Sequence, residues 1–166
     1  MRRVLIGDGD RSDMAICASV AIPTYQRSAF VLDALQTILA QQTDFAYEVL
    51  VLDNGCDSTL KVKVERMASS VSIPVIYIAV PEPGLHNGRH SGAQHAEGEI
   101  IVFTDDDIIA DSGWLQAIVD TFHDPDVHLV GGRNLPLYEE DPPAWLEALW
   151  TQNPCLLYTS DAADDL

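Results

Sequence analysis

Residues 99–107 read Glu-Ile-Ile-Val-Phe-Thr-Asp-Asp-Asp, an apolar run that ends in three consecutive carboxylates. The run is short, continuous and rich in β-branched residues, which is typical of a strand buried on both faces of a sheet. Such a strand would bring Asp105, Asp106 and Asp107 to the edge of the sheet. Because like charges this close repel one another, the triplet indicates a bound cation, with a solvated acidic turn that caps the next helix as the alternative.

Further apolar runs of the same kind lie along the chain, and segments with a helical period separate them. This alternation predicts the α/β class with a mostly parallel sheet flanked by helices. In such sheets ligands bind outside the carboxyl ends of the strands. Besides residues 100–103, the expected strands are Ile16–Ile22, Tyr47–Leu52, Val75–Val80 and Val127–Val130. The helices expected from periodicity are Ala29–Gln41, Thr59–Ser70, Gly113–Phe122 and one that starts near Pro142, and Gly98 can close a further helix before the fourth strand.

Length, charge and cysteine content restrict the class of protein. The 166 residues, 47% of them hydrophobic, suit one soluble domain. The net charge of −17 argues against a nucleic-acid partner, and no apolar stretch reaches the roughly 18 residues that span a bilayer. Cys17, Cys56 and Cys155 show neither paired nor metal-ligand spacing, which suits a reducing compartment. We therefore expect a cytoplasmic protein, and leave peripheral association at the inner face of the membrane open.

The two ends of the chain differ from the segment between them. Met14 directly precedes the first expected strand, so residues 1–13 are expected to be a spurious extension read from a misplaced start. Residues 155–166 resemble the translated adapter end of transposase-based DNA sequencing libraries. The sequence therefore predicts one incomplete domain over residues 14–154.

From Ala15 to about Pro154 the chain resembles the family 2 glycosyltransferases of the GT-A fold. The resemblance rests on four stretches in a fixed order, each of them at or near the end of an expected strand. It implies a Rossmann-like, mostly parallel sheet flanked by helices, of which this chain would hold the N-terminal, donor-binding part. The four stretches are IPTYQR at 22–27, EVLVLDNG at 48–55, PGLHNGRHSGAQHAEGE at 83–99 and FTDDD at 103–107.

The resemblance implies that the chain binds a nucleotide-diphosphate sugar. Pro23, Thr24 and Tyr25 would form the turn that contacts the base, with the ring of Tyr25 laid against it. Asp53 would accept hydrogen bonds from the base or the ribose. Packing at the rim is the alternative for Tyr25, and an Asx turn before Gly55 is the alternative for Asp53.

Arg89 and the aspartate triplet complete the implied site. Arg89 matches the basic residue that the family places near the donor, although Gly88-Arg89-His90 replaces the usual Ala-Arg-Asn. Asp105 would lie near the ribose, and Asp106 or Asp107 would bind Mn²⁺ or Mg²⁺ between the two phosphates. A UDP-sugar is the expected donor because uracil is the commonest base in the family.

The implied activity is sugar transfer, with inversion, to an unknown acceptor: a saccharide, a lipid or a protein. Inversion needs a general base, and no residue of this chain is assigned that role, so the chain is expected to be inactive alone. A non-catalytic nucleotide- or nucleotide-sugar-binding module is the alternative. A phosphatase is disfavoured because its aspartate motif follows the first strand, and a nucleotidyltransferase because the first-strand turn lacks a loop rich in glycine and basic residues.

Overall fold

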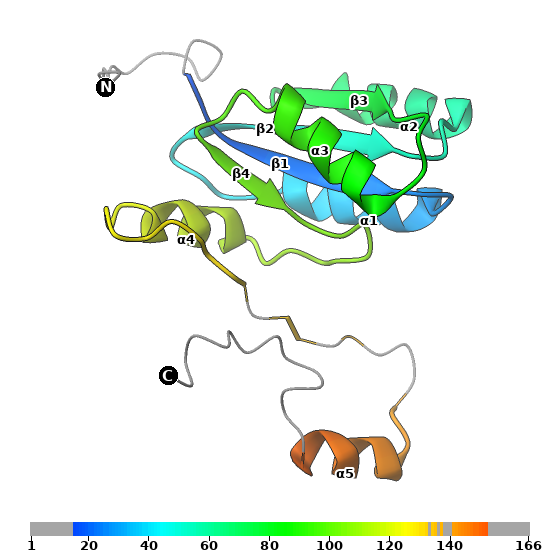
Figure 1. The fold of residues 1–166 in the computed structure, drawn as a ribbon, viewed down its shortest axis with the longest axis vertical. Helices are drawn as coiled ribbons and strands as arrows, with labels where there is room; N and C mark the ends of the chain where they lie inside the picture. Colours follow the sequence, from blue (N-terminus) through cyan, green and yellow to red (C-terminus); the bar gives the residue numbers. More distant parts are fainter. Residues whose placement is uncertain (1–14, 133, 136, 138–140, 153–166) are drawn as a thin grey trace. The chain divides into compact units, whose positions relative to one another are not determined.

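The computed structural model describes residues 15–132, 134, 135, 137 and 141–152. The chain divides into two units, residues 1–120 and 121–166, and each is described by itself. All the described strands lie in the first unit (Figure 1). In chain order the elements are β1 (Ile16–Thr24), α1 (Ser28–Leu39), β2 (Ala46–Asp53), α2 (Ser58–Ala68), β3 (Val75–Ala79), α3 (Leu85–His95), β4 (Ile100–Phe103), α4 (Trp114–Thr121) and α5 (Ala144–Gln152).

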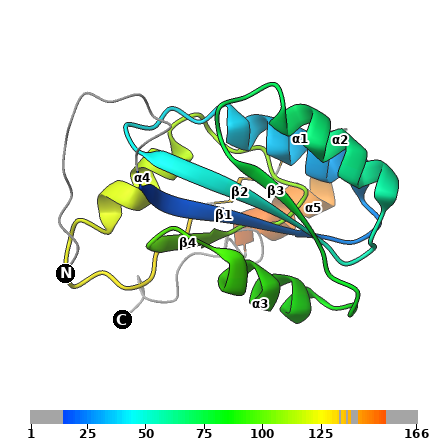
Figure 2. The ribbon, with the colours of Figure 1, turned by 90° about the horizontal axis from the view of Figure 1, so that it is seen from above.

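The four strands form one parallel sheet in the order β3-β2-β1-β4. The two central strands, β1 and β2, are buried along nearly their whole length, as continuous apolar runs require when both faces of a sheet are covered. Helices α1 and α2 lie on one face and α3 lies on the other (Figure 2). The predicted α/β class with a parallel sheet is confirmed.

Alternate residues of the central strands supply two separate cores. Val49 and Val51 of β2 belong to the larger core, which Leu35 of α1 and Leu115 of α4 complete. Leu50, one position along β2, belongs to the smaller core on the opposite face. Because successive side chains of a strand point to opposite faces, an uninterrupted apolar run can fill both cores at once.

Helix α3 approaches the sheet through two glycines. A Cβ on Gly88 would lie 2.9 Å from Asn54 Oδ1, and one on Gly92 would lie 3.0 Å from the Cβ of Ala21. Larger side chains at these positions would push the helix away from β1 and β2. This contact through glycine also explains why α3 was absent from the helices predicted by periodicity, since its inner face carries few apolar side chains.

The register of β4 determines where the aspartate triplet lies. Phe103, the last residue of β4, pairs with Ala21, although β1 continues to Thr24. The Thr104 N–H donates to the Ala21 carbonyl oxygen at 3.1 Å, so the chain beyond β4 stays beside the end of β1. The three carboxylates therefore follow the strand, as predicted.

The second unit contains helix α5, and one strand prediction for this unit is wrong. Val127–Val130 was expected to be a fifth strand, but residues 127–132 form neither strand nor helix, and Leu129 is 90% exposed. The Val127 N–H donates to the Asp124 carbonyl in a local turn, so an apolar run alone did not produce sheet pairing. The predicted helix near Pro142 is present as α5. The interpretations of residues 1–13 and 155–166 lie outside the described residues.

Within the described residues, no helix combines the length and the apolar character that a bilayer crossing needs.

Candidate functional site

A cavity of about 600 Å³ opens at the carboxyl ends of β1, β2 and β4. This is where parallel α/β sheets bind ligands, and the volume falls within the usual range for small-molecule sites. Its lining combines apolar side chains, two polar side chains, one cation and three carboxylates. The lining residues are Pro23, Thr24, Tyr25, Arg27, Asn54, Pro83, Gly84, Leu85, Asp105, Asp106 and Asp107.

Part of the cavity lining, here called the apolar wall, consists of the apolar side chains Tyr25 and Leu85 and is exposed to solvent. Tyr25 is 53% exposed and Leu85 is 50% exposed, so neither side chain belongs to a core. Gly84, with φ of 129°, turns the chain into α3 at a backbone conformation that side-chain-bearing residues rarely adopt. Asn54 Nδ2 donates to the Glu82 carbonyl oxygen at 2.9 Å, which ties this wall to the end of β2.

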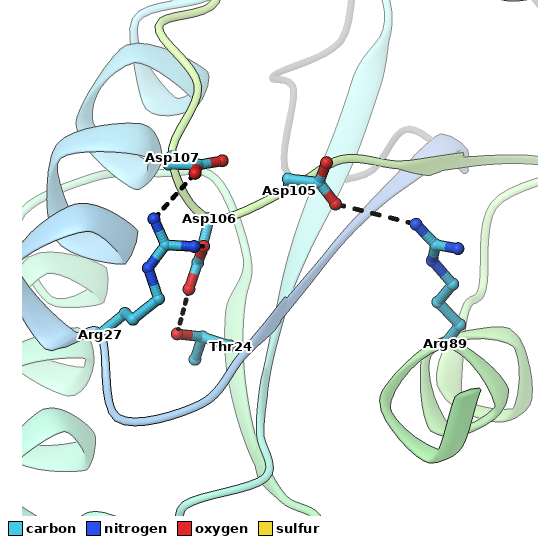
Figure 3. A network of polar contacts seen from close by, with 6 residues as sticks. All are labelled: Thr24, Arg27, Arg89, Asp105, Asp106 and Asp107. Carbon is cyan, nitrogen blue, oxygen red and sulfur yellow. Dashed lines mark hydrogen bonds and ion pairs between the residues drawn. The ribbon is translucent and has the colours of Figure 1, made fainter. Parts of the chain in front are cut away.

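The aspartate triplet also lines the cavity, and Arg27 bridges two of its members (Figure 3). Arg27 Nη1 lies 3.0 Å from Asp106 Oδ1, and Nη2 lies 2.8 Å from Asp107 Oδ2. The Thr24 hydroxyl donates to Asp106 Oδ2 at 2.7 Å. Both oxygens of Asp106 are thus engaged by the protein, and this residue is only 5% exposed.

Electrostatics hold Arg27 charged in this position. Its hydrogen bond to Asp107 is the largest cause that raises the pKa of the guanidinium, and the charges of Asp106, Asp107 and Asp105 raise it further. The guanidinium also lies 4.7 Å from the ring centroid of Phe30, a cation–π distance. Arg27 therefore provides a positive charge where the sequence predicts a metal ion.

Arg89 approaches the triplet from the other side, on α3 (Figure 3). Its Nη2 lies 3.7 Å from Asp105 Oδ1, and both side chains are largely exposed. An ion pair of this length between exposed groups contributes little to stability. Arg89 is near the predicted site, but it is not among the residues that line the cavity.

Asp53 also lies behind the cavity, and the protein's own donors surround it. Its Oδ1 accepts from the Gly55 N–H at 2.7 Å, and its Oδ2 accepts from the Asp57 N–H and the Tyr77 hydroxyl, each at 2.7 Å. Asp53 is 1% exposed. Burial and, secondarily, this carboxylate raise the pKa of Tyr77. The arrangement matches the Asx turn that the sequence left open as an alternative.

The described residues contain no group of three or more His, Cys, Asp and Glu side chains placed to hold a metal ion. The triplet nevertheless offers suitable chemistry, because Mn²⁺ and Mg²⁺ prefer carboxylate oxygens. Asp107 and Asp105 are the accessible members, with side chains 45% and 65% exposed, and Asp106 is the buried one.

The structure brings most of the predicted site residues together. Pro23, Thr24, Tyr25 and the three aspartates line one cavity, whereas Asp53 and Arg89 do not. Sequence reasoning gave no role to Arg27 or to Asn54, although both lie within the quoted stretches after the first and second strands. Their polar side chains at strand ends were the available signal. The other lining residues that it did not select are Pro83, Gly84 and Leu85.

The chain is similar to known sugar-transferring proteins. The family described as Glycosyl transferase family 2 matches residues 19–160. The glycosyltransferase AglE of Haloferax volcanii is 30% identical over 116 residues, which cover 69% of this chain and 38% of AglE. The poly(ribitol-phosphate) beta-N-acetylglucosaminyltransferase TarS of Staphylococcus aureus strain MW2 is 27% identical over 165 residues, which cover 89% of this chain and 28% of TarS.

A solved structure of S. aureus TarS, residues 1–349 in complex with UDP-GlcNAc, matches with a TM-score of 0.51 and 27% identity. The match covers 74% of this chain and 37% of that one. This chain therefore spans well under half the length of the relatives that it matches.

Proposed function

The chain belongs to glycosyl transferase family 2, and we propose that it binds the nucleotide-diphosphate sugar donor of a glycosyltransferase. The observation that carries the proposal is the cavity at the strand ends, whose lining combines the apolar wall with three carboxylates. Such a site suits a ligand with a flat base at one end and a metal-bound diphosphate at the other. The UDP-GlcNAc complex of TarS supports this class of ligand.

The apolar wall would receive the base. Tyr25 and Leu85, both half-exposed, offer surfaces on which a base can lie, and Pro23 and Thr24 form the turn beneath. We propose uracil as the base. Asp105 would contact the ribose.

Arg89 and Asp53 do not line the cavity, but we propose a role in donor binding for each. Arg89 would approach the diphosphate from α3. We propose that Asp53 supports the nucleoside side of the site by holding the turn at residues 53–57 through its three hydrogen bonds.

We further propose that Asp107 and Asp106 hold Mn²⁺ or Mg²⁺. Asp107 is the expected direct ligand because its side chain is 45% exposed. The side chain of Asp106 is only 6% exposed and accepts a hydrogen bond from Thr24. A bound cation would neutralise the diphosphate and act as a Lewis acid on the leaving group. This neutralisation matters in a chain of net charge −17, since an anionic ligand would otherwise be repelled.

In the proposed transfer, an acceptor hydroxyl attacks the anomeric carbon with inversion. The bond from that carbon to the diphosphate breaks, and the nucleoside diphosphate leaves with the electron pair. A general base must take the hydroxyl proton. The acceptor is a saccharide, a lipid or a protein. We place the activity in the cytoplasm or at the inner face of the membrane, which the free thiols of Cys17 and Cys56 support.

A second candidate function is a nucleotide- or nucleotide-sugar-binding module without catalysis. One observation favours it: among the described residues, the carboxylates that line the cavity are the three aspartates already assigned to donor and metal. No described lining residue is then left to serve as the base. Measured sugar transfer or donor hydrolysis by this chain would exclude this candidate.

Calorimetry of UDP binding, with and without Mn²⁺, tests the proposal. Mn²⁺ should tighten binding, and Asp107→Asn should abolish that gain. Asp33→Asn on the exposed side of α1 makes the same charge change away from the cavity and should keep it. Equal UDP affinity with and without metal would refute the metal assignment, and no binding of UDP, GDP or dTDP would refute the donor site itself.

A further inference from the structure

The guanidinium of Arg27 occupies carboxylate oxygens that a metal ion at the aspartate triplet would need. We infer that Arg27 is a built-in counter-cation that competes with the divalent ion for Asp107, so that metal binding requires its release. This inference rests on the proposed function, because it concerns the same metal site. It adds a device that regulates how readily that site is filled.

The contact geometry supports direct competition. One guanidinium places Nη1 3.0 Å from Asp106 Oδ1 and Nη2 2.8 Å from Asp107 Oδ2, so it bridges two neighbouring carboxylates. A divalent ion coordinated by Asp107 would lie within a few ångströms of the same guanidinium. Two cations at that separation repel strongly in a partly desolvated cavity. Metal binding and the present position of Arg27 are therefore mutually unfavourable.

The position of Arg27 in the chain allows it to leave. Arg27 precedes α1 as its N-cap residue, in the turn that follows β1, and its side chain is 43% exposed. Its contact with the ring of Phe30, also half-exposed, offers a surface along which the guanidinium can move without losing all its contacts. Because Arg27 lines the cavity, its charge stays available to an anionic ligand after it leaves the carboxylates.

The same contact stabilises the site before metal arrives. Three consecutive carboxylates repel one another, and Asp106 is nearly buried. Arg27 offsets part of this repulsion. Its removal should therefore have two opposite effects: the metal-free protein should become less stable, and the metal should bind more tightly.

The test measures Mn²⁺ binding alone, on the whole 166-residue chain, from the electron paramagnetic resonance signal of the free ion. Arg27→Gln should tighten Mn²⁺ binding about fivefold, the upper end of what is expected for loss of one partly exposed competing ion pair. Arg66→Gln, an exposed cation in the last turn of α2, makes the same charge change away from the site. It should leave the affinity within about twofold, because salt screens distant charges.

Arg27→Lys gives a second, milder variant. Lysine keeps the charge but lacks the planar fork that bridges two carboxylates, so its Mn²⁺ affinity should lie between the wild-type and glutamine values. A thermal melt provides a separate readout: Arg27→Gln should lower the midpoint without metal and show a larger rise on adding Mn²⁺.

Unchanged or weaker Mn²⁺ binding by Arg27→Gln and Arg27→Lys would overturn the inference. If the wild-type chain still binds UDP in a metal-dependent way in that case, the proposed function stands and only the competition fails. If neither the wild type nor the variants bind Mn²⁺, the inference and the proposed metal site fail together. UDP binding that does not depend on metal would leave the donor site in place.

Discussion

Carboxylates lie at the carboxyl ends of both β2 and β4, but the protein holds them in different ways. Asp53, the last residue of β2, accepts hydrogen bonds from two backbone N–H groups and from Tyr77, and it is buried. Asp107, after β4, is paired with the long, half-exposed side chain of Arg27. The fold fixes the positions of backbone donors, whereas an arginine side chain can change its rotamer and leave its partner. The first carboxylate is thus a fixed part of the fold, and the second can exchange its partner for a ligand.

The largest expected effect follows from removing the fixed carboxylate, that of Asp53. Asp53→Ala would remove the buried acceptor of two backbone N–H groups and of the Tyr77 hydroxyl, which would keep only its longer, 3.4 Å hydrogen bond to the Asp57 carbonyl oxygen. We expect it to lower the free energy of unfolding by about 3 kcal/mol, measured by urea denaturation. Tyr77→Phe, which removes one of the three hydrogen bonds, should cost about 1 kcal/mol. A loss for Asp53→Ala no larger than that for Tyr77→Phe would contradict the role of the backbone donors.

Within the triplet, the same comparison separates Asp106 from Asp107. Asp106→Ala would remove the acceptor of the buried Thr24 hydroxyl and should lower the free energy of unfolding by about 1.5 kcal/mol. Asp107→Ala should cost less, because its side chain is 45% exposed. The Mn²⁺ effect on UDP binding should show the reverse order, with the larger loss for Asp107→Ala. Equal effects of the two variants in both measurements would contradict the separate roles of Asp106 in stability and Asp107 in metal binding.

A smaller effect should appear in alkaline solution. Burial and the bond to Asp53 raise the pKa of Tyr77 in the folded state, so the folded chain keeps a proton that the unfolded chain loses above pH of about 10. The contribution of Tyr77 to stability is therefore complete below that pH and declines above it. Urea denaturation between pH 9 and about 11 should show a steeper decline for the wild type than for Tyr77→Phe. Parallel declines would show that the pKa of Tyr77 is not raised in the folded state.

Much of the fold could be predicted because its strands are continuous apolar runs. Tyr47–Leu52 lies within β2 and Ile100–Phe103 matches β4. Of the polar residues after them, Asn54 and the three aspartates line one cavity, whereas Asp53 does not. The family resemblance is confirmed. Local pattern failed for Val127–Val130, because an apolar run becomes a strand only when another strand accepts its hydrogen bonds. Periodicity gave no signal for α3, whose contact with the sheet depends on glycines rather than on apolar side chains, and only Gly98 as a closing residue indicated a helix there.

The details of the site depended on contacts between distant residues. Nothing local to Asp53 reveals that Tyr77, 24 residues away, donates to it. Arg27 and Asp107 are 80 residues apart, so their pairing follows from the register of β1 and β4 and not from either motif alone. The sequence could therefore predict which strand ends carry the candidate site, but not which carboxylate accepts hydrogen bonds from other parts of the protein.

The exposure of the apolar wall has a consequence for how such a protein can diversify. Tyr25 and Leu85 lie outside both cores, on a turn and at the first residue of a helix, so substitutions there leave the packing of the sheet intact. Substitutions at these two positions therefore need no compensating mutations in the cores. Because we propose that Tyr25 and Leu85 contact the base, mutant libraries confined to them should yield altered preferences among bases while most members still fold. Under the proposed function, the preferred nucleotide could then change during evolution while the architecture persists.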